Sequence, residues 1–130
     1  MPSYGAPVPS ILRHGDKELR EFPVSTRTVL GKKIIFSGGG YFWLVPYPLL
    51  KSWSGECEDN GYLLSYIHPR DLDVGQPMLE GLPLKRKFKS YVGTKGAAVK
   101  LEKYLKDFDF VDARSAAEAI DWSSVPVVEL

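Results

Sequence analysis

The feature that most constrains the fold is a continuous apolar run that stops at a histidine and a proline. Residues 62–67 hold one small polar residue and show no alternation between apolar and polar positions. A run of this kind is typical of a strand that is covered on both faces, as in a parallel sheet between helices. Because His68 and Pro69 follow at once, we expect the histidine at the carboxyl end of a buried strand.

Extended and helical patterns alternate along the rest of the chain, which favours an α/β fold. Residues 97–108 place apolar side chains at three- and four-residue spacing, and this predicts a helix whose N-cap is Thr94. Pro46 suits the first turn of another helix, because the first N–H groups of a helix have no partner within it. Strands are expected at residues 19–25, 33–36, 62–67 and 108–112, and further helices at residues 46–55 and at residues 115–122 with Ser115 as cap.

The length of 130 residues suits one domain with one core. Residues 1–18 carry prolines and glycines with little periodicity, so we expect an irregular lead-in there and a single domain over residues 19–130. No apolar run approaches the roughly 18–20 residues that span a bilayer. The first residues lack the pattern of a signal peptide, and the expected location is therefore cytoplasmic.

The charge balance argues against nucleic acid as a partner. The formal net charge is +1, so no bulk field attracts a polyanion. The basic run at residues 85–89 is short, and a solvated surface is the simpler interpretation of it. Cys57 lies between two glutamates, whose charge disfavours a thiolate, and we expect it to be an unreactive thiol.

His68 is the best candidate for chemistry. Residues at the carboxyl ends of strands line the active crevice in α/β folds, and an imidazole can transfer a proton near neutral pH. Asp71 and Asp73 lie close enough in the sequence to orient it. The alternative is a structural histidine that hydrogen-bonds the backbone of the following loop, and the spacing alone leaves both interpretations open.

A glycine triplet at residues 38–40 precedes Tyr41 and Phe42. Its backbone N–H groups could cradle an anion, but the lysine and hydroxyl residue of a P-loop are missing. Positive φ angles or a close backbone approach would equally require glycine, and the same geometry would expose the two aromatic side chains to a sugar. A metal site within the chain is not expected, because His14 and His68 are far apart and no ligand pair has metal-binding spacing.

Several segments, taken in order, make the chain resemble the C-terminal part of a polysaccharide deacetylase. The likeness is to the exopolysaccharide-associated bacterial branch of the NodB-like carbohydrate esterases, and it extends over about residues 4–110. The segments that carry it are residues 21–26, residues 37–42 with Pro46 and Tyr47, residues 66–69 with Asp73 and residues 76–77, and residues 87–91, 100–101 and 107–110.

The resemblance implies the C-terminal half of a (β/α) barrel of the polysaccharide deacetylase type, which hydrolyses acetyl groups from a glycan. In such enzymes a divalent metal, commonly zinc, is held by an aspartate and two histidines, and a second aspartate acts as base on the bound water. A histidine near the end of the barrel protonates the leaving group, and this catalytic role maps onto His68. Six residues map onto the substrate groove and its wall: Gly39, Gly40, Tyr41, Phe42, Tyr66 and Ile67.

The residues that activate water in this family have no counterpart here. The aspartate pair, the His-x-x-x-His ligands and the arginine–proline motif are missing, and Trp43 and Arg70 replace an arginine and a tryptophan of the family pattern. We therefore expect no cofactor in this chain, no deacetylase activity from this chain alone, and a partner chain that carries the first half of the barrel. The alternative is a module that binds glycan or protein without catalysis.

Overall fold

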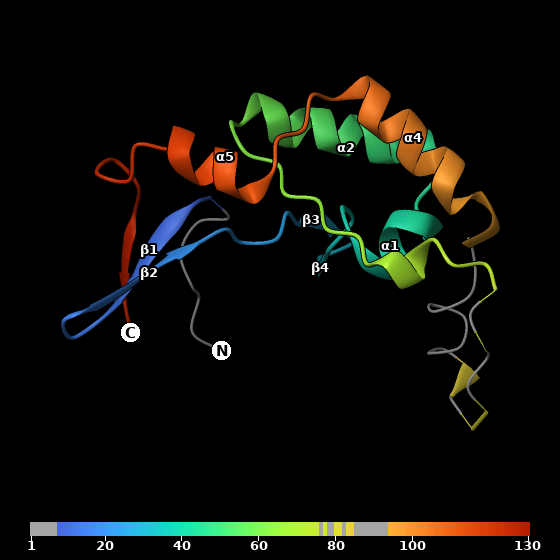
Figure 1. Ribbon diagram of the computed structural model, residues 1–130, viewed down its shortest axis with the longest axis horizontal. Coiled ribbons are helices and arrows are strands. Elements are labelled where there is room, and N and C mark those ends of the chain that lie inside the picture. The colour runs from blue at the N-terminus through green and yellow to red at the C-terminus, as the bar shows by residue number, and fades with distance from the viewer. Residues whose placement is uncertain (1–7, 76, 78–79, 82, 85–93) are drawn as a thin grey trace. The chain divides into compact units, whose positions relative to one another are not determined.

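The computed structural model describes residues 8–75, 77, 80–81, 83–84 and 94–130. It combines small sheets with separate helices (Figure 1), so the predicted combination of strands and helices is confirmed. The chain forms two compact units, one made of Met1–Val24 with Phe110–Leu130 and the other of Ser25–Asp109. These units do not follow the predicted division at residue 18.

The first unit is built on a three-stranded sheet. Strand β1 (Ser10–His14) lies in the middle, antiparallel to β2 (Lys17–Glu21) and parallel to β5 (Val127–Glu129). The sheet thus joins the two sequence segments of this unit, because β5 comes from its C-terminal part.

Both predictions for the N-terminal segment need correction. The irregular lead-in expected over residues 1–18 contains β1, since its prolines and glycines flank that strand rather than interrupt it. The strand expected at residues 19–25 is β2, which begins earlier and ends two residues before Pro23. Proline lacks the N–H that a strand pairing needs, and this is consistent with the early end of β2.

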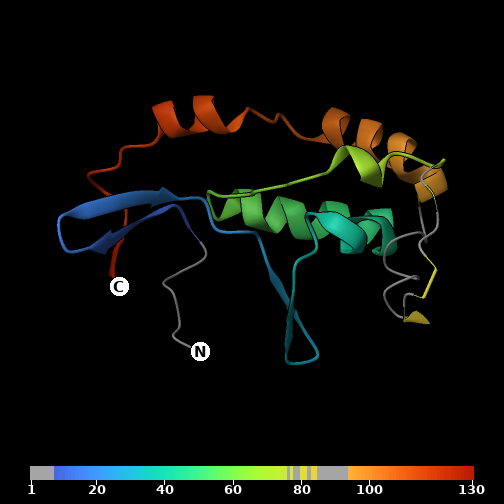
Figure 2. The same ribbon diagram turned by 60° about the horizontal axis from the view of Figure 1, so that its bottom comes forward.

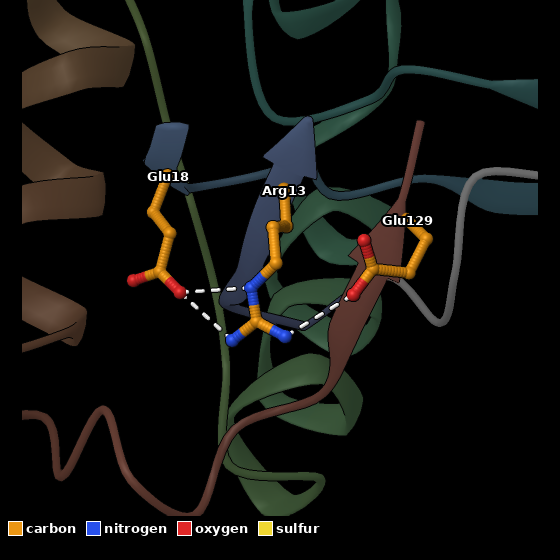
Figure 3. A network of polar contacts seen from close by, with 3 residues as sticks. All are labelled: Arg13, Glu18 and Glu129. Atoms are coloured by element: carbon orange, nitrogen blue, oxygen red, sulfur yellow. Dashed lines mark hydrogen bonds and ion pairs between the residues drawn. The ribbon is translucent and has the colours of Figure 1, made fainter. Parts of the chain in front are cut away.

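An arginine ties the three strands of this sheet together (Figure 3). The Arg13 guanidinium on β1 bonds Glu18 Oε1 on β2, with N–O distances of 2.8 and 2.9 Å, and Glu129 Oε1 on β5 at 3.1 Å. The hydrogen bond to Glu18 is the main reason that the pKa of Arg13 is raised. Because all three side chains are exposed, we expect the network to favour the register of the strands more than to add stability.

Helix α5 (Ala113–Ala119) completes the first unit and begins two residues earlier than predicted. Its N-cap is Asp112, whose Oδ1 accepts a hydrogen bond from the Ser115 N–H at 2.7 Å. Ser115 is therefore not the cap, and the bond from its N–H lowers the pKa of Asp112. The strand expected at residues 108–112 is absent from this described stretch, which leads into the helix instead.

The second unit begins with an antiparallel hairpin of β3 (Arg27–Val29) and β4 (Lys32–Ile34). The turn expected at Gly31 is confirmed, and it also includes Leu30. The strand expected at residues 33–36 begins one residue earlier and is shorter. Phe36 and Ser37, just beyond it, are fully buried.

Two helices follow the hairpin, α1 (Gly39–Leu44) and α2 (Tyr47–Asp59). Helix α2 begins directly after Pro46, as predicted. Gly55 does not end this helix. One glycine within a helix lowers helix stability by only about 1 kcal/mol relative to alanine, and the flanking turns can offset that loss. The short helix α1 was not expected from its run of glycines and aromatic residues.

Helix α4 (Ala97–Asp107) follows a 3-10 turn, η2 (Thr94–Gly96), so the clearest helix of the sequence is confirmed. Its N-cap is Gly96 and not the predicted Thr94, because the 3-10 turn comes first. Its predicted apolar stripe is confirmed in part: Ala97 and Tyr104 are buried, whereas Leu105 is 54% exposed. Among the described residues, none of the helices has both the length and the apolar character needed to cross a bilayer.

The core of the second unit gathers around Tyr104, which is 1% exposed. Its hydroxyl lies 2.6 Å from Ser54 Oγ on α2 and 3.3 Å from Ser65 Oγ. Its ring meets the rings of Phe42 and Phe108 edge-on, with centroids 5.1 and 5.2 Å apart. Helices α2 and α4 lie side by side around these contacts (Figure 1), so one tyrosine joins both helices to the run at residues 62–67.

Replacing Tyr104 with phenylalanine should destabilise the second unit by about 1–3 kcal/mol, because the buried Ser54 hydroxyl loses this partner. Burial also raises the pKa of Tyr104 above its usual value of 10.0. The stability linked to this raised pKa is complete below that usual value and is lost as the pH rises toward the folded-state pKa. Urea unfolding at neutral and alkaline pH should show a smaller alkaline loss in the variant, and an equal loss in both proteins would contradict this assignment.

Candidate functional site

The apolar run at residues 62–67 is held by side chains rather than by a sheet. Ser25 Oγ accepts a hydrogen bond from the Leu64 N–H at 2.9 Å, and Ser37 Oγ donates to the Leu64 carbonyl at 2.6 Å. Both serines are buried. The run is not the regular strand that its sequence predicts, because these hydroxyls satisfy backbone groups that a neighbouring strand would otherwise pair.

Within this run, Tyr66 forms an isolated backbone bridge of the parallel kind with Gly38. A Cβ added at Gly38 would lie 2.5 Å from Cδ1 and Cε1 of Tyr66 and 2.6 Å from its carbonyl oxygen. No side chain fits such a space, so this glycine permits the close approach. The next residue, Gly39, has a φ of 56°, which glycine adopts without strain. Both structural explanations for the glycine triplet are thus confirmed: Gly38 allows a close backbone approach, and Gly39 has a positive φ.

His68 follows this run and is exposed. Its ring meets that of Tyr66 edge-on, with centroids 5.8 Å apart. The chain then turns through the short helix η1 (Pro69–Asp71). The His68 N–H donates to Asp71 Oδ2 at 3.0 Å, and the Asp71 N–H donates to the His68 carbonyl at 2.8 Å. These two bonds fix the backbone of His68 while its imidazole remains open to solvent.

The two aspartates that were expected to orient the imidazole bind backbone groups instead. The Asp71 carboxylate accepts from the main chain of His68, and Asp73 Oδ1 accepts from the Gly75 N–H at 2.9 Å. The backbone of His68 therefore takes part in folding the loop. The exposed imidazole is accessible to a ligand.

An open hollow is lined by His68, Pro69 and Arg70. An imidazole and a guanidinium are both hydrogen-bond donors, and Arg70 adds a permanent positive charge. Such a pair favours ligands that are rich in acceptor oxygens. The hollow also gives a ligand direct access to the His68 ring.

The structure brings part of the predicted groove together. Tyr66 lies against the glycine-rich turn, and its hydroxyl is 3.4 Å from the position that a Cβ on Gly39 would take. Gly40 and Tyr41 lie in the first turn of helix α1 and are partly exposed, as is Ile67 beside Tyr66. These five residues remain candidates for contact with a ligand.

Phe42 does not belong to that surface, which corrects the prediction that it faces a substrate. It is fully buried, and its ring meets those of Trp43 and Tyr104 edge-on at 4.6 and 5.1 Å. The reason is helix α1, which begins at Gly39 and turns Phe42 into the core of the second unit.

Lys100 is a supporting residue that the sequence reasoning missed. Its ammonium donates to the Val45 carbonyl and, at 3.3 Å, to the Trp43 carbonyl at the end of α1, and it lies 5.5 Å from the centre of the Phe42 ring. Burial lowers the pKa of Lys100. The signal was its position four residues before Tyr104, on the face of α4 that turns inward. Lys100 thus helps to hold the helix that follows the glycine-rich turn.

The donor groups of this unit do not fit a metal site. Within the described ranges, no three His, Cys, Asp or Glu side chains come together in a way that could hold an ion. Cys57 on α2 has a raised pKa, mainly because of burial and also because of Glu56. A raised pKa disfavours the thiolate that binds metals, in agreement with the expected unreactive thiol.

Comparison with known families gives one match. The model of a family described as a domain of unknown function, DUF3473, matches residues 2–118. No curated protein matches the chain, and no solved structure does either.

Proposed function

Because this chain belongs to the DUF3473 family, whose description assigns no activity, we propose a function from its site: the chain carries the C-terminal part of a NodB-like polysaccharide deacetylase. In this proposal its substrate is an acetylated glycan. His68 is the general acid, and the surface of Gly39, Gly40, Tyr41, Tyr66 and Ile67 contacts the sugar.

The observation that carries the proposal is the parallel pairing of Gly38 with Tyr66. Helices α1 and α2 lie between these two residues in the sequence. A (β/α) barrel repeats a βαβ unit, in which helices join two parallel strands. The Gly38–Tyr66 bridge has this parallel sense and this helical connection, although neither residue lies in a regular strand. The pairing therefore supports a partial barrel, and it puts His68 directly after the second parallel segment, where such folds carry their catalytic residues.

His68 suits a proton donor because its backbone is fixed and its imidazole opens into the hollow. In the proposed reaction a water oxygen adds to the acetyl carbonyl carbon and gives up a proton to a base that this chain does not supply. The bond from that carbon to the sugar nitrogen or oxygen then breaks, and the leaving atom takes the proton of the His68 imidazolium. Acetate and the free amine or alcohol are the products.

The neighbouring residues suit a sugar. Tyr66 offers an aromatic ring with a polar end, a combination that packs on the apolar face of a sugar while accepting or donating a hydrogen bond. Gly39 and Gly40 carry no side chain, so a ligand can approach their backbone. Arg70 lines the same hollow as His68.

The water must be activated by groups that this chain does not bring together. The family resemblance implies a zinc ion held by an aspartate and two histidines, and the described residues do not fit that donor set. We propose that the metal ligands and the catalytic base lie outside these 130 residues. This chain then supplies the proton donor and one wall of the groove.

A second candidate function is glycan binding without catalysis. The observation in its favour is that Asp71 and Asp73 bind backbone groups, so the carboxylates nearest in sequence to His68 are used to build the turn. In this case the hollow would hold an oxygen-rich ligand through His68 and Arg70 alone.

Acetate release separates the two functions. We expect no acetate from acetylated chitooligosaccharides with zinc and this chain alone, and release once a segment with an Asp-Asp pair and His-x-x-x-His is supplied. Glycan binding with no release under either condition would favour the second function. Release by this chain alone would contradict the proposal.

A further inference from the structure

The tip of the β3–β4 hairpin carries an apolar side chain in an unusual conformation. Leu30 and Gly31 have φ angles of 49° and 76°, as in the tight turns that close hairpins. Leu30 is the one residue other than glycine with a positive φ among the described parts of the chain. It is also 98% exposed, so burial within the fold does not stabilise the leucine side chain.

This turn would be more stable with asparagine or glycine at the position of Leu30. Left-handed backbone is unfavourable for a residue with a bulky side chain, and asparagine and glycine are the residues that such turns prefer. Positions that break a local rule without a gain in the fold are often functional. Leu30 thus points to a contact outside the unit that carries it.

Two exposed lysines follow the tip on β4. Lys32 and Lys33 follow Gly31 directly, and because neighbouring residues of a strand point to opposite faces, each face of the hairpin carries one positive charge. The base of the hairpin is fixed, since Arg27 pairs with Glu56 and its guanidinium lies 5.9 Å from the centre of the Trp53 ring.

Figure 2 shows the hairpin projecting away from helices α1 and α2 of the same unit. The tip therefore exposes one leucine, and the strand that follows it carries one lysine on each face of a hairpin whose base is held in place. Because each face of the hairpin carries a lysine, the hairpin would approach a negatively charged surface with its tip rather than with one of its faces.

We propose that this tip contacts an anionic lipid surface, with Leu30 in the boundary between headgroups and acyl chains and with Lys32 and Lys33 on the headgroups. A single leucine is too small for a stable protein interface, which buries on the order of 1,000 Å² or more. A lipid surface needs no matching shape. It can bury one apolar side chain while its anionic headgroups attract the nearby lysines. The contact is weak and reversible, because one leucine and two lysines orient a protein without anchoring it.

The test is sedimentation of the whole chain with mixed phosphatidylserine–phosphatidylcholine vesicles, compared with pure phosphatidylcholine. We expect preference for the anionic vesicles and a loss of about tenfold in partitioning for Leu30→Asn. The same variant should melt at a higher temperature, because asparagine suits the turn, so loss of folding cannot explain weaker binding. Equal partitioning of both proteins, or no preference for anionic vesicles, would overturn the proposal.

Charge at the tip needs its own control, because the chain contains other lysines. Replacing Lys32 and Lys33 with glutamine should weaken partitioning by roughly fivefold for each lysine. Replacing the exposed Lys17 and Lys95 with glutamine removes the same charge elsewhere and should have little effect. An equal loss in both double variants would mean that net charge alone attracts the chain, and it would overturn the proposal.

Discussion

Replacing His68 with glutamine should lower acetate release from an N-acetylated glycan by about 10²–10⁴-fold, the usual effect of removing a general acid. The measurement uses this chain together with the segment that activates water. Glutamine keeps a polar side chain of similar reach, but it has no proton to give up at neutral pH. The fold should survive, because His68 is exposed and the hydrogen bonds that fix it use its backbone.

His14 offers a matched control for this variant. It is also exposed, and its Nδ1 lies 3.1 Å from the Leu130 carbonyl in the first unit rather than in the hollow. His14→Gln should leave the rate of acetate release unchanged. A rate for His68→Gln within twofold of the wild type, with substrate saturating in both cases, would remove the histidine from the mechanism.

Replacing Gly38 with alanine should destabilise the second unit by about 1–3 kcal/mol, the usual cost of an added carbon where there is no room. The new Cβ would lie within 2.6 Å of the ring and of the carbonyl oxygen of Tyr66. The carbonyl cannot rotate away as a flexible side chain would. Tyr66 must therefore move, and because its ring meets that of His68, we also expect weaker glycan binding in the protein that remains folded.

Gly55→Ala is the control for this substitution. Gly55 lies within α2, and no atom lies within 4 Å of an added Cβ there. Alanine should stabilise the helix by up to about 1 kcal/mol. Urea unfolding compares the two variants, and an equal effect of both on the free energy of unfolding would contradict the close approach of Gly38 to Tyr66.

The helices were the part of the fold that the sequence predicted best. The apolar spacing of α4 and the proline before α2 are local signals, and local signals survive folding because they depend on neighbouring residues alone. The cap of α5 was missed although Asp112 and Ser115 both suit the role. Only the backbone conformation decides between them, and it selects Asp112.

The run at residues 62–67 was misjudged for a different reason. Its composition predicts a strand covered on both faces, whereas all six residues of the run are only half-buried. The composition also does not show which groups pair with the backbone. Here two serines far away in the sequence, Ser25 and Ser37, bind Leu64. Contacts between distant residues leave no periodic trace in a single sequence.

The candidate site was predicted in outline and not in detail. His68, Tyr66 and the glycines next to it do lie together. Phe42 was placed on the surface because a run of glycine and aromatic residues gives no sign of the short helix that buries it.

The leaving group gives the most direct test of the proposed role of His68. A glycan amine needs a proton to depart, whereas 4-nitrophenolate departs without one, so an acid helps the first reaction and not the second. We would measure acetate release by the wild type and by His68→Gln, each with the water-activating segment, from an N-acetylated chitooligosaccharide and from 4-nitrophenyl acetate. A large loss on the glycan with little loss on the aryl ester is predicted, and an equal loss on both substrates would contradict His68 as the proton donor.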